Sequence, residues 1–139
     1  GVAAVEFGLV IGLLVLVSFV ATELGRAFYQ YNSLIKSARA ALREFSLAGP
    51  VGTLGSREEL AKCIAAYGVR PCDPKHDTQV MEGLTIDMVE MSSGTGMLPG
   101  NLPYTYGCAT IRDYHFISLV EWFDLVFAPI STCMRQNPS

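Results

Sequence analysis

The feature that most constrains this chain is its apolar N-terminal segment, GVAAVEFGLVIGLLVLVSFVAT, which contains a single charged side chain, Glu6. The sixteen residues between Glu6 and Glu23 carry no charge. As a helix they would cover about 24 Å, short of the ~30 Å hydrocarbon core of a bilayer. The 21 residues from Val2 to Thr22 do cover it. We therefore predict a membrane-spanning helix that includes Glu6.

The helical pattern does not stop at the end of this span. Apolar residues continue at three- and four-residue spacing, while charged and amide side chains such as Glu23, Arg26 and Gln30 fill the other face. Ala48-Gly49-Pro50 should end the helix. The expected division is a span (1–22), an amphipathic stalk (23–48) and a head (49–139). We expect the stalk stripe to pack partly under its own sheet and partly against neighbouring subunits; its members are Phe28, Tyr31, Leu34, Ile35, Ala38 and Leu42.

The head reads as one short helix followed by strands. A capping box at Ser56–Glu59 predicts a helix that ends before Gly68. Residues 69–80 should form a loop, and the Gly-, Ser- and Pro-rich residues 92–103 a flexible connection. Residues 118–129 suggest a crossover or short helix. Three strands are expected at 84–91, 104–117 and 130–136, so the predicted fold class is α+β, with a long stalk helix and a small antiparallel sheet.

The four cysteines all follow the span: Cys63, Cys72, Cys108 and Cys133. No C-x-x-C pair is present, which argues against a zinc or thioredoxin-type site. We expect two disulfides formed in an oxidising compartment, with sequence-local pairing of Cys63 to Cys72 and Cys108 to Cys133. Four buried free thiols are the alternative.

Motifs that carry chemistry are sparse. His76, between Asp73 and Asp77, could bind a metal, but a solvated loop is the preferred interpretation. His115 is expected to be a half-buried strand residue. The sequence has no G-x-S-x-G, P-loop or Rossmann glycine pattern. The net charge of −3 and the scattered Lys and Arg give no case for nucleic-acid binding. We therefore predict no catalysis, no cofactor and no metal.

Glu6 needs an explanation because a carboxylate within a bilayer is costly. It could snorkel to the headgroups as an interfacial residue. The functional alternative is an ion pair with the terminal amine of a neighbouring identical chain, which would set the vertical register between subunits. Gly8 and Gly12 form a G-x-x-x-G pattern, which lets two helices approach closely.

The stretch Gly1-Val2-Ala3-Ala4-Val5-Glu6-Phe7, with its apolar run and the following Glu23-Leu24-Gly25-Arg26, resembles TadE-like pseudopilins of the type IVb (Flp/Tad) pilus systems. Gly1, Glu6 and Phe7 match the family spacing. The resemblance is looser beyond the first 45 residues; its further landmarks are Ala65-Ala66-Tyr67-Gly68, Gly83-Leu84-Thr85, Tyr114, Phe116, Pro129 and Met134-Arg135.

This resemblance implies a structural subunit, pilin or pseudopilin, rather than an enzyme. A prepilin peptidase would cut between Gly1 and Val2, and this cut would remove a basic leader that precedes the apolar segment. Assembly would use Glu6, Phe7, Gly8 and Gly12, with copies of this chain or other pilins and the pilus assembly machinery as partners. The subunit would wait in the bacterial inner membrane with a periplasmic head and then enter an extracellular filament. The rival hypothesis is a monomeric bitopic membrane protein whose periplasmic domain binds a ligand or partner.

Overall fold

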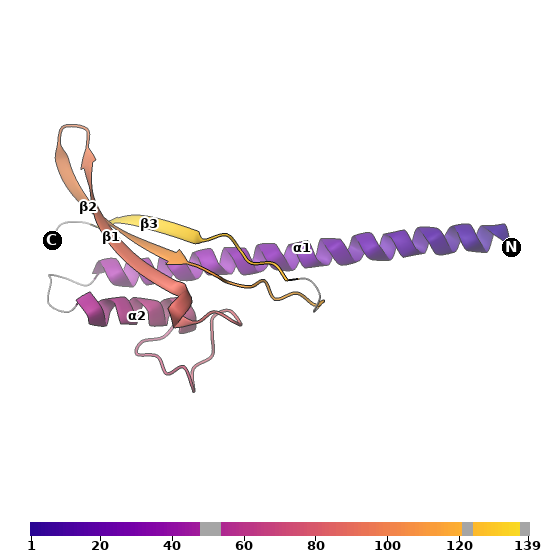
Figure 1. Ribbon diagram of the computed structural model, residues 1–139, viewed down its shortest axis with the longest axis horizontal. Coiled ribbons are helices and arrows are strands. Elements are labelled where there is room, and N and C mark those ends of the chain that lie inside the picture. Colours follow the sequence, from indigo (N-terminus) through magenta and orange to yellow (C-terminus); the bar gives the residue numbers. More distant parts are fainter. Residues whose placement is uncertain (48–53, 121–123, 137–139) are drawn as a thin grey trace.

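The computed structural model describes residues 1–47, 54–120 and 124–136. Two helices, α1 (Val2–Leu47) and α2 (Leu54–Tyr67), precede a 3-10 turn, η1 (Ile86–Met88), and three strands, β1 (Val89–Leu98), β2 (Leu102–Ile111) and β3 (Ile130–Gln136). Figure 1 shows the head gathered around the C-terminal half of α1, while the N-terminal half projects alone. The fold is α+β, as the sequence predicts.

Helix α1 is unbroken for 46 residues, which makes it about 70 Å long. By length and composition it could cross a membrane, and its most apolar window is not buried by any other part of the chain. From Gln30 onward the helix buries one stripe under the head. Leu34, Ala38 and Ala41 are 0% exposed and Leu42 is 1% exposed. The two halves of one helix therefore have opposite environments.

The head core lies where α2 and the sheet meet the second half of α1. Small side chains dominate the helix–helix contact, because Ala38, Ala41, Ala61 and Ala65 are all fully buried in one cluster. Such residues let helix axes approach closely. The same cluster contains larger side chains from α1, the strands and the connecting segments, namely Leu34, Leu42, Leu84, Val89, Ile111, Tyr114 and Ile130.

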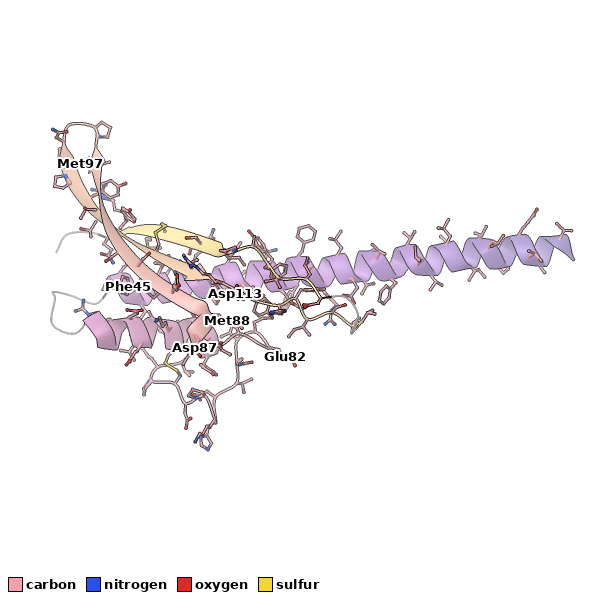
Figure 2. The ribbon with its side chains drawn as sticks, viewed as in Figure 1. Phe45, Glu82, Asp87, Met88, Met97 and Asp113 are labelled. Atoms are coloured by element: carbon pink, nitrogen blue, oxygen red, sulfur yellow. A yellow bond between two sulfur atoms is a disulfide. The ribbon has the colours of Figure 1, made fainter. Side chains whose placement is uncertain are left out.

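The sheet is antiparallel in the order β1-β2-β3. Strand β3 pairs with β2 only from Thr105 to Ile111, so the end of the β1–β2 hairpin has two strands. That end projects past the C-terminal end of α1 (Figure 1), with Met97 near its tip (Figure 2). A turn carries the chain from Leu98 to Leu102 through Gly100, whose φ of 96° suits glycine.

The first strand lies further along the chain than predicted. Residues 84 and 85 are irregular and residues 86–88 form η1, while β1 occupies much of the segment that we expected to be a flexible connection. Gly94 is paired with Tyr106, and Gly96 with Tyr104. A Cβ at either glycine would come within 2.6 Å of the opposite tyrosine ring or hydroxyl. The tyrosines thus cover the glycines and supply the cross-strand contact that glycine cannot make.

The second strand is shorter than predicted, ending at Ile111 rather than at Ile117. Asp113 adopts a left-handed φ of 56°, which interrupts the extended chain. Beyond it, His115 and Val126 form an isolated antiparallel bridge. Within residues 118–120 and 124–129 the structure has no helix, so the expected short helix is wrong there. His115 is exposed rather than half-buried. The third strand lies at residues 130–136, as predicted.

The helix ends largely follow the sequence signals. Helix α2 begins at Leu54, two residues before the predicted cap at Ser56. It ends where predicted: Gly68 has a φ of 72°, and its N–H donates to the carbonyl of Ile64 at 3.0 Å. The Gly-Pro signal expected to stop α1, at residues 48–50, lies outside the described residues.

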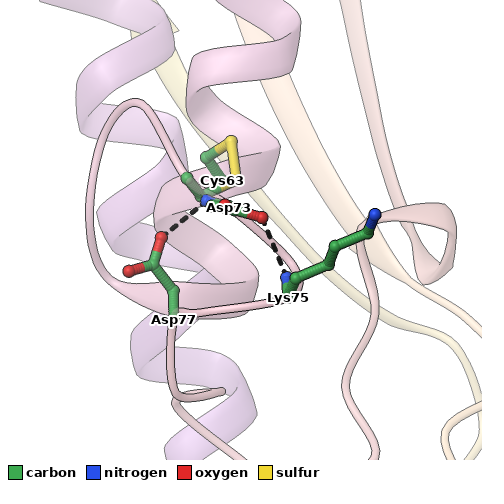
Figure 3. The surroundings of a disulfide bond; sticks show 5 residues. Cys63, Asp73, Lys75 and Asp77 are labelled. Atoms are coloured by element: carbon green, nitrogen blue, oxygen red, sulfur yellow. Dashed lines mark hydrogen bonds between the residues drawn. A yellow bond between two sulfur atoms is a disulfide. The ribbon is translucent and has the colours of Figure 1, made fainter.

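Two disulfides join the same cysteines that the sequence argument paired. Cys63 on α2 is bonded to Cys72 in the following loop (Figure 3). Cys108 on β2 is bonded to Cys133, its direct partner on β3, with a Cα–Cα distance of 4.1 Å. The described residues contain no free cysteine.

Candidate functional site

We call residues 2–22 of α1, which project from the head, the free half. All the residues expected to act in assembly lie there. Glu6 and Phe7 are exposed, the latter by 67%. A Cβ at Gly8 or Gly12 would meet nothing within 4 Å. Gly1 and Val2, the expected processing site, open the helix, where the N–H of Ala4 donates to the Gly1 carbonyl at 3.2 Å. The chain itself therefore leaves this entire surface available.

Helix geometry separates the carboxylate from the glycines. At about 100° per residue, Gly8 and Gly12 share one face, and Glu6 lies roughly 120–160° around the axis from them. The nearest Lys or Arg along the chain is Arg26, about 30 Å further up the helix. One helix can thus offer its glycine face to one neighbour and Glu6 to another.

Where the free half meets the head, three polar side chains of α1 hold a segment of the head by its backbone. We call Glu23, Arg26 and Gln30 the stalk clamp. Gln30 donates to the carbonyl of Ile117 at 3.0 Å and accepts from the N–H of the same residue at 3.2 Å. Arg26 Nη2 donates to that carbonyl as well, at 3.1 Å.

Glu23 is the residue of the stalk clamp nearest to the free half of α1. Its carboxylate accepts a hydrogen bond from the Ser118 hydroxyl at 2.9 Å and from the backbone N–H of Leu119 at 3.1 Å. Ser118 Oγ also accepts from the N–H of Val120 at 3.0 Å. A charged acceptor makes such bonds stronger than neutral ones. The segment after β2 is therefore fixed at the level of Glu23.

The stalk clamp corrects the sequence prediction for this part of α1. Glu23, Arg26 and Gln30 were assigned to the solvent face, yet Gln30 is only 6% exposed. Conversely, Phe28 and Tyr31 of the apolar stripe are 60% and 41% exposed. The spacing of the three polar residues was visible in the sequence. Their partners are mainly backbone groups, so no complementary pattern of side chains in the sequence predicts these contacts.

An aromatic cluster anchors the clamped segment to the head. Phe127 stacks on Tyr114 at 6.0 Å and meets Tyr31 of α1 edge-on at 5.9 Å between ring centroids. The Tyr114 hydroxyl donates to the carbonyl of Glu82 at 2.8 Å. Burial, with a smaller contribution from the Glu82 carboxylate, raises the pKa of Tyr114 to about 12. The phenol is therefore neutral at physiological pH.

An apolar groove of about 710 Å³ runs between α1 and the clamped segment. Its helix wall extends from Gly12 to Ala27, and its other wall comes from Phe116, Ser118, Val120 and Leu125. Apart from Glu23 and Ser118, which are bonded to each other, every lining residue is apolar.

Of the two histidines singled out in the sequence, His76 lies in the loop after α2 and His115 lies beside the groove residues Phe116 and Leu125. His76 contacts Asp73 at 2.6 Å, and Asp73 and Asp77 accept backbone hydrogen bonds within their own loop (Figure 3). The backbone N–H of Lys75, and then His76, hold the pKa of Asp73 below its usual value. His115 pairs with Asp124 at 3.0 Å. In the described part of the chain, no group of three or more His, Cys, Asp or Glu side chains is placed to hold a metal.

Comparison with known proteins finds a similarity over the N-terminal part of the chain. The model of the family described as TadE-like protein matches residues 1–43, which comprise Gly1 and α1 without its last turn. No curated protein and no solved structure matches the chain. The resemblance that the sequence suggested is thus supported by the family match over the membrane half and most of the stalk.

Proposed function

We propose, from the TadE-like character of residues 1–43, that this chain is a structural subunit, pilin or pseudopilin, of a Tad-type pilus. It is anchored in the bacterial inner membrane by residues 1–22, with its disulfide-bonded head in the periplasm. It then joins a filament in which the same residues pack against copies of itself or other pilins. A prepilin peptidase that cuts between Gly1 and Val2 and the pilus assembly machinery act on it.

The observation that carries this proposal is the exposure of the free half of α1. About 30 Å of apolar helix is left unburied by the rest of the chain. In water such a surface would associate, whereas a bilayer or a bundle of like helices covers it. Because the head does not fold back over it, the helix can pass from one environment to the other without refolding the head.

Glu6 supplies the register in this proposal. Its partner is the amine of an adjacent subunit's first residue, since the chain offers no Lys or Arg at that depth. An unpaired carboxylate among packed helices is costly, so subunits at the wrong depth are disfavoured. Gly8 and Gly12, on another face, let a second helix approach.

The test compares two substitutions of Glu6 in cells that assemble the filament. Glu6→Gln keeps the shape and loses the charge, while Glu6→Ala also removes the hydrogen-bonding group. Both variants should insert in the membrane at least as well as the wild type, because a costly charge is gone. Both should be depleted from sheared surface filaments, as judged by electron microscopy and mass spectrometry of the subunits.

Glu90→Gln is the matched control, because Glu90 is exposed on the head in a surface pair with Arg112, at 3.0 Å, whose loss costs little. If Glu6→Gln enters filaments as well as Glu90→Gln does, charge pairing at Glu6 is wrong. If the wild-type chain never occurs in filaments and remains monomeric in the membrane, the rival bitopic binding protein is favoured.

A further inference from the structure

We propose that the segment after β2 is a second membrane contact: its apolar side chains lie in the headgroup–acyl boundary of the leaflet nearest the head, and lipid acyl chains fill the groove between it and α1. We call residues 116–120 and 124–127 the flap. The inference rests on the proposed anchoring of α1 in a bilayer.

The position of the flap along α1 is the first argument. The flap is the part of the head that reaches furthest toward the N-terminal half of the helix (Figure 1). Glu23, which follows the predicted end of the span at Thr22, is bonded to Ser118 and to the N–H of Leu119. The groove wall on α1 continues from there through Val20, Phe19 and Leu16, which belong to the span. Flap and span therefore meet at the membrane boundary.

The exposed side chains of the flap are the second argument. Leu119 is 59% exposed, Leu125 42% and Val126 48%. Leu125 lines the groove together with the apolar residues of α1, and Leu119 lies between the groove residues Ser118 and Val120. Exposed apolar side chains of the head therefore lie beside the apolar groove at the end of the span. An interfacial depth of about 5–10 Å suits such a surface.

The third argument is that the flap can leave water at little cost. Several of its backbone N–H groups have partners within the chain: the N–H of Phe116 donates to Leu125, that of Phe127 to Tyr114, and that of Leu119 to Glu23. Backbone groups with partners tolerate low dielectric, whereas unpaired ones do not.

The lining and length of the groove favour lipid acyl chains as its occupant. From Gly12 to Ala27 the groove runs for about 22 Å along the part of α1 that includes the end of the span. Its two polar lining residues, Glu23 and Ser118, are bonded to each other, and the rest of the lining is apolar. A hydrocarbon chain lying along the span therefore meets an apolar wall on both sides.

The experiment measures quenching of tryptophan fluorescence by brominated lipids. The full chain is reconstituted at low density in phosphatidylcholine vesicles whose acyl chains are brominated near the glycerol backbone. All variants carry Trp122→Phe, which removes the only native tryptophan. Leu119→Trp and, independently, Leu125→Trp report on the flap. Phe19→Trp reports on the span, and Val69→Trp, at an exposed position of the loop after α2, reports on the head.

Both flap variants should be quenched at least half as strongly as Phe19→Trp, while Val69→Trp should be quenched hardly at all. Peptide mapping without reduction checks that every variant retains the disulfides Cys63–Cys72 and Cys108–Cys133. If Phe19→Trp is quenched and both flap variants behave like Val69→Trp, the flap proposal is overturned and the anchor stands. If Phe19→Trp itself is unquenched, α1 does not enter the bilayer and the proposed function fails with it.

Discussion

The two halves of α1 share one unbroken backbone but differ in where their partners are. Residues 2–22 are all exposed, whereas the second half buries Leu34, Ala38, Ala41 and Leu42 almost completely. Backbone hydrogen bonding is the same in both. One helix therefore has two kinds of partner. The head of the same chain covers its second half, and a bilayer or other subunits must cover its first half.

The largest effect should come from placing a charge in each half in turn. Leu34→Asp puts a carboxylate at a fully buried position, which costs several kcal/mol and should unfold the head. Leu14→Asp, at a position 58% exposed in the free half, should leave the head folded and penalise insertion by about 3–4 kcal/mol.

Limited proteolysis in detergent and alkaline extraction of membranes separate these two outcomes. The comparison fails if Leu14→Asp unfolds the head, or if Leu34→Asp leaves its protease resistance unchanged.

Removal of the disulfides tests whether stability is confined to the head. Replacing Cys108 and Cys133 by Ser should destabilise the chain by about 3.5 kcal/mol, and replacing Cys63 and Cys72 by about 2.6 kcal/mol, because the longer loop of 25 residues gains more chain entropy than the loop of 9. Urea titration in detergent, followed by near-UV circular dichroism, measures both. Membrane insertion should not change, and equal losses for the two pairs would contradict the loop-length argument.

Substitutions in the stalk clamp test how strongly it stabilises the junction between the two halves of α1. Gln30→Leu leaves both backbone groups of Ile117 without their amide partner, which should cost about 1–3 kcal/mol. Tyr29→Ala is the control on the same turn, since Tyr29 is 69% exposed and its loss should change stability by less than about 0.5 kcal/mol. Urea midpoints in detergent compare the two. If both substitutions cost the same, the clamp does not stabilise the junction.

The smallest effect concerns Tyr114, beside the junction. Its folded-state pKa of about 12 lies above the ordinary tyrosine pKa of about 10, so the unfolded chain loses this proton first as pH rises. The stabilisation is complete below pH 10 and should be lost progressively as the pH approaches 12. Tyr114→Phe should flatten this alkaline decline, at a cost of about 1 kcal/mol near neutrality for the lost hydrogen bond to Glu82. Thermal unfolding across the alkaline range measures it, and an unchanged slope would exclude Tyr114 as the titrating group.

The sequence predicts best those elements whose periodicity, caps or cysteine order can be recognised within one continuous segment. The unbroken α1, the end of α2 at Gly68, the third strand and the cysteine pairs were all legible from periodicity, caps and order along the chain. The hairpin was missed because Gly94 and Gly96 discourage a strand until Tyr106 and Tyr104 are known to lie opposite.

The stalk clamp and the flap were missed for a different reason. Glu23 and Gln30 bind mainly backbone groups, which every sequence has, so no pattern of side chains marks the partner. The candidate assembly residues of the free half could be identified from the sequence because they belong to one local stretch. Their partners lie outside the chain and are accordingly a matter for the experiments above.

The unbroken backbone of α1 also couples movement of the subunit along the helix axis to rotation about it. If a neighbour's contact moves from one residue of the free half to the next, the whole subunit advances by about 1.5 Å and turns by about 100°. Because α1 continues without interruption into the head, the β1–β2 hairpin turns with it. If the proposed pairing fixes the depth of Glu6, it therefore also sets the direction in which the β1–β2 hairpin points at the opposite end of the molecule.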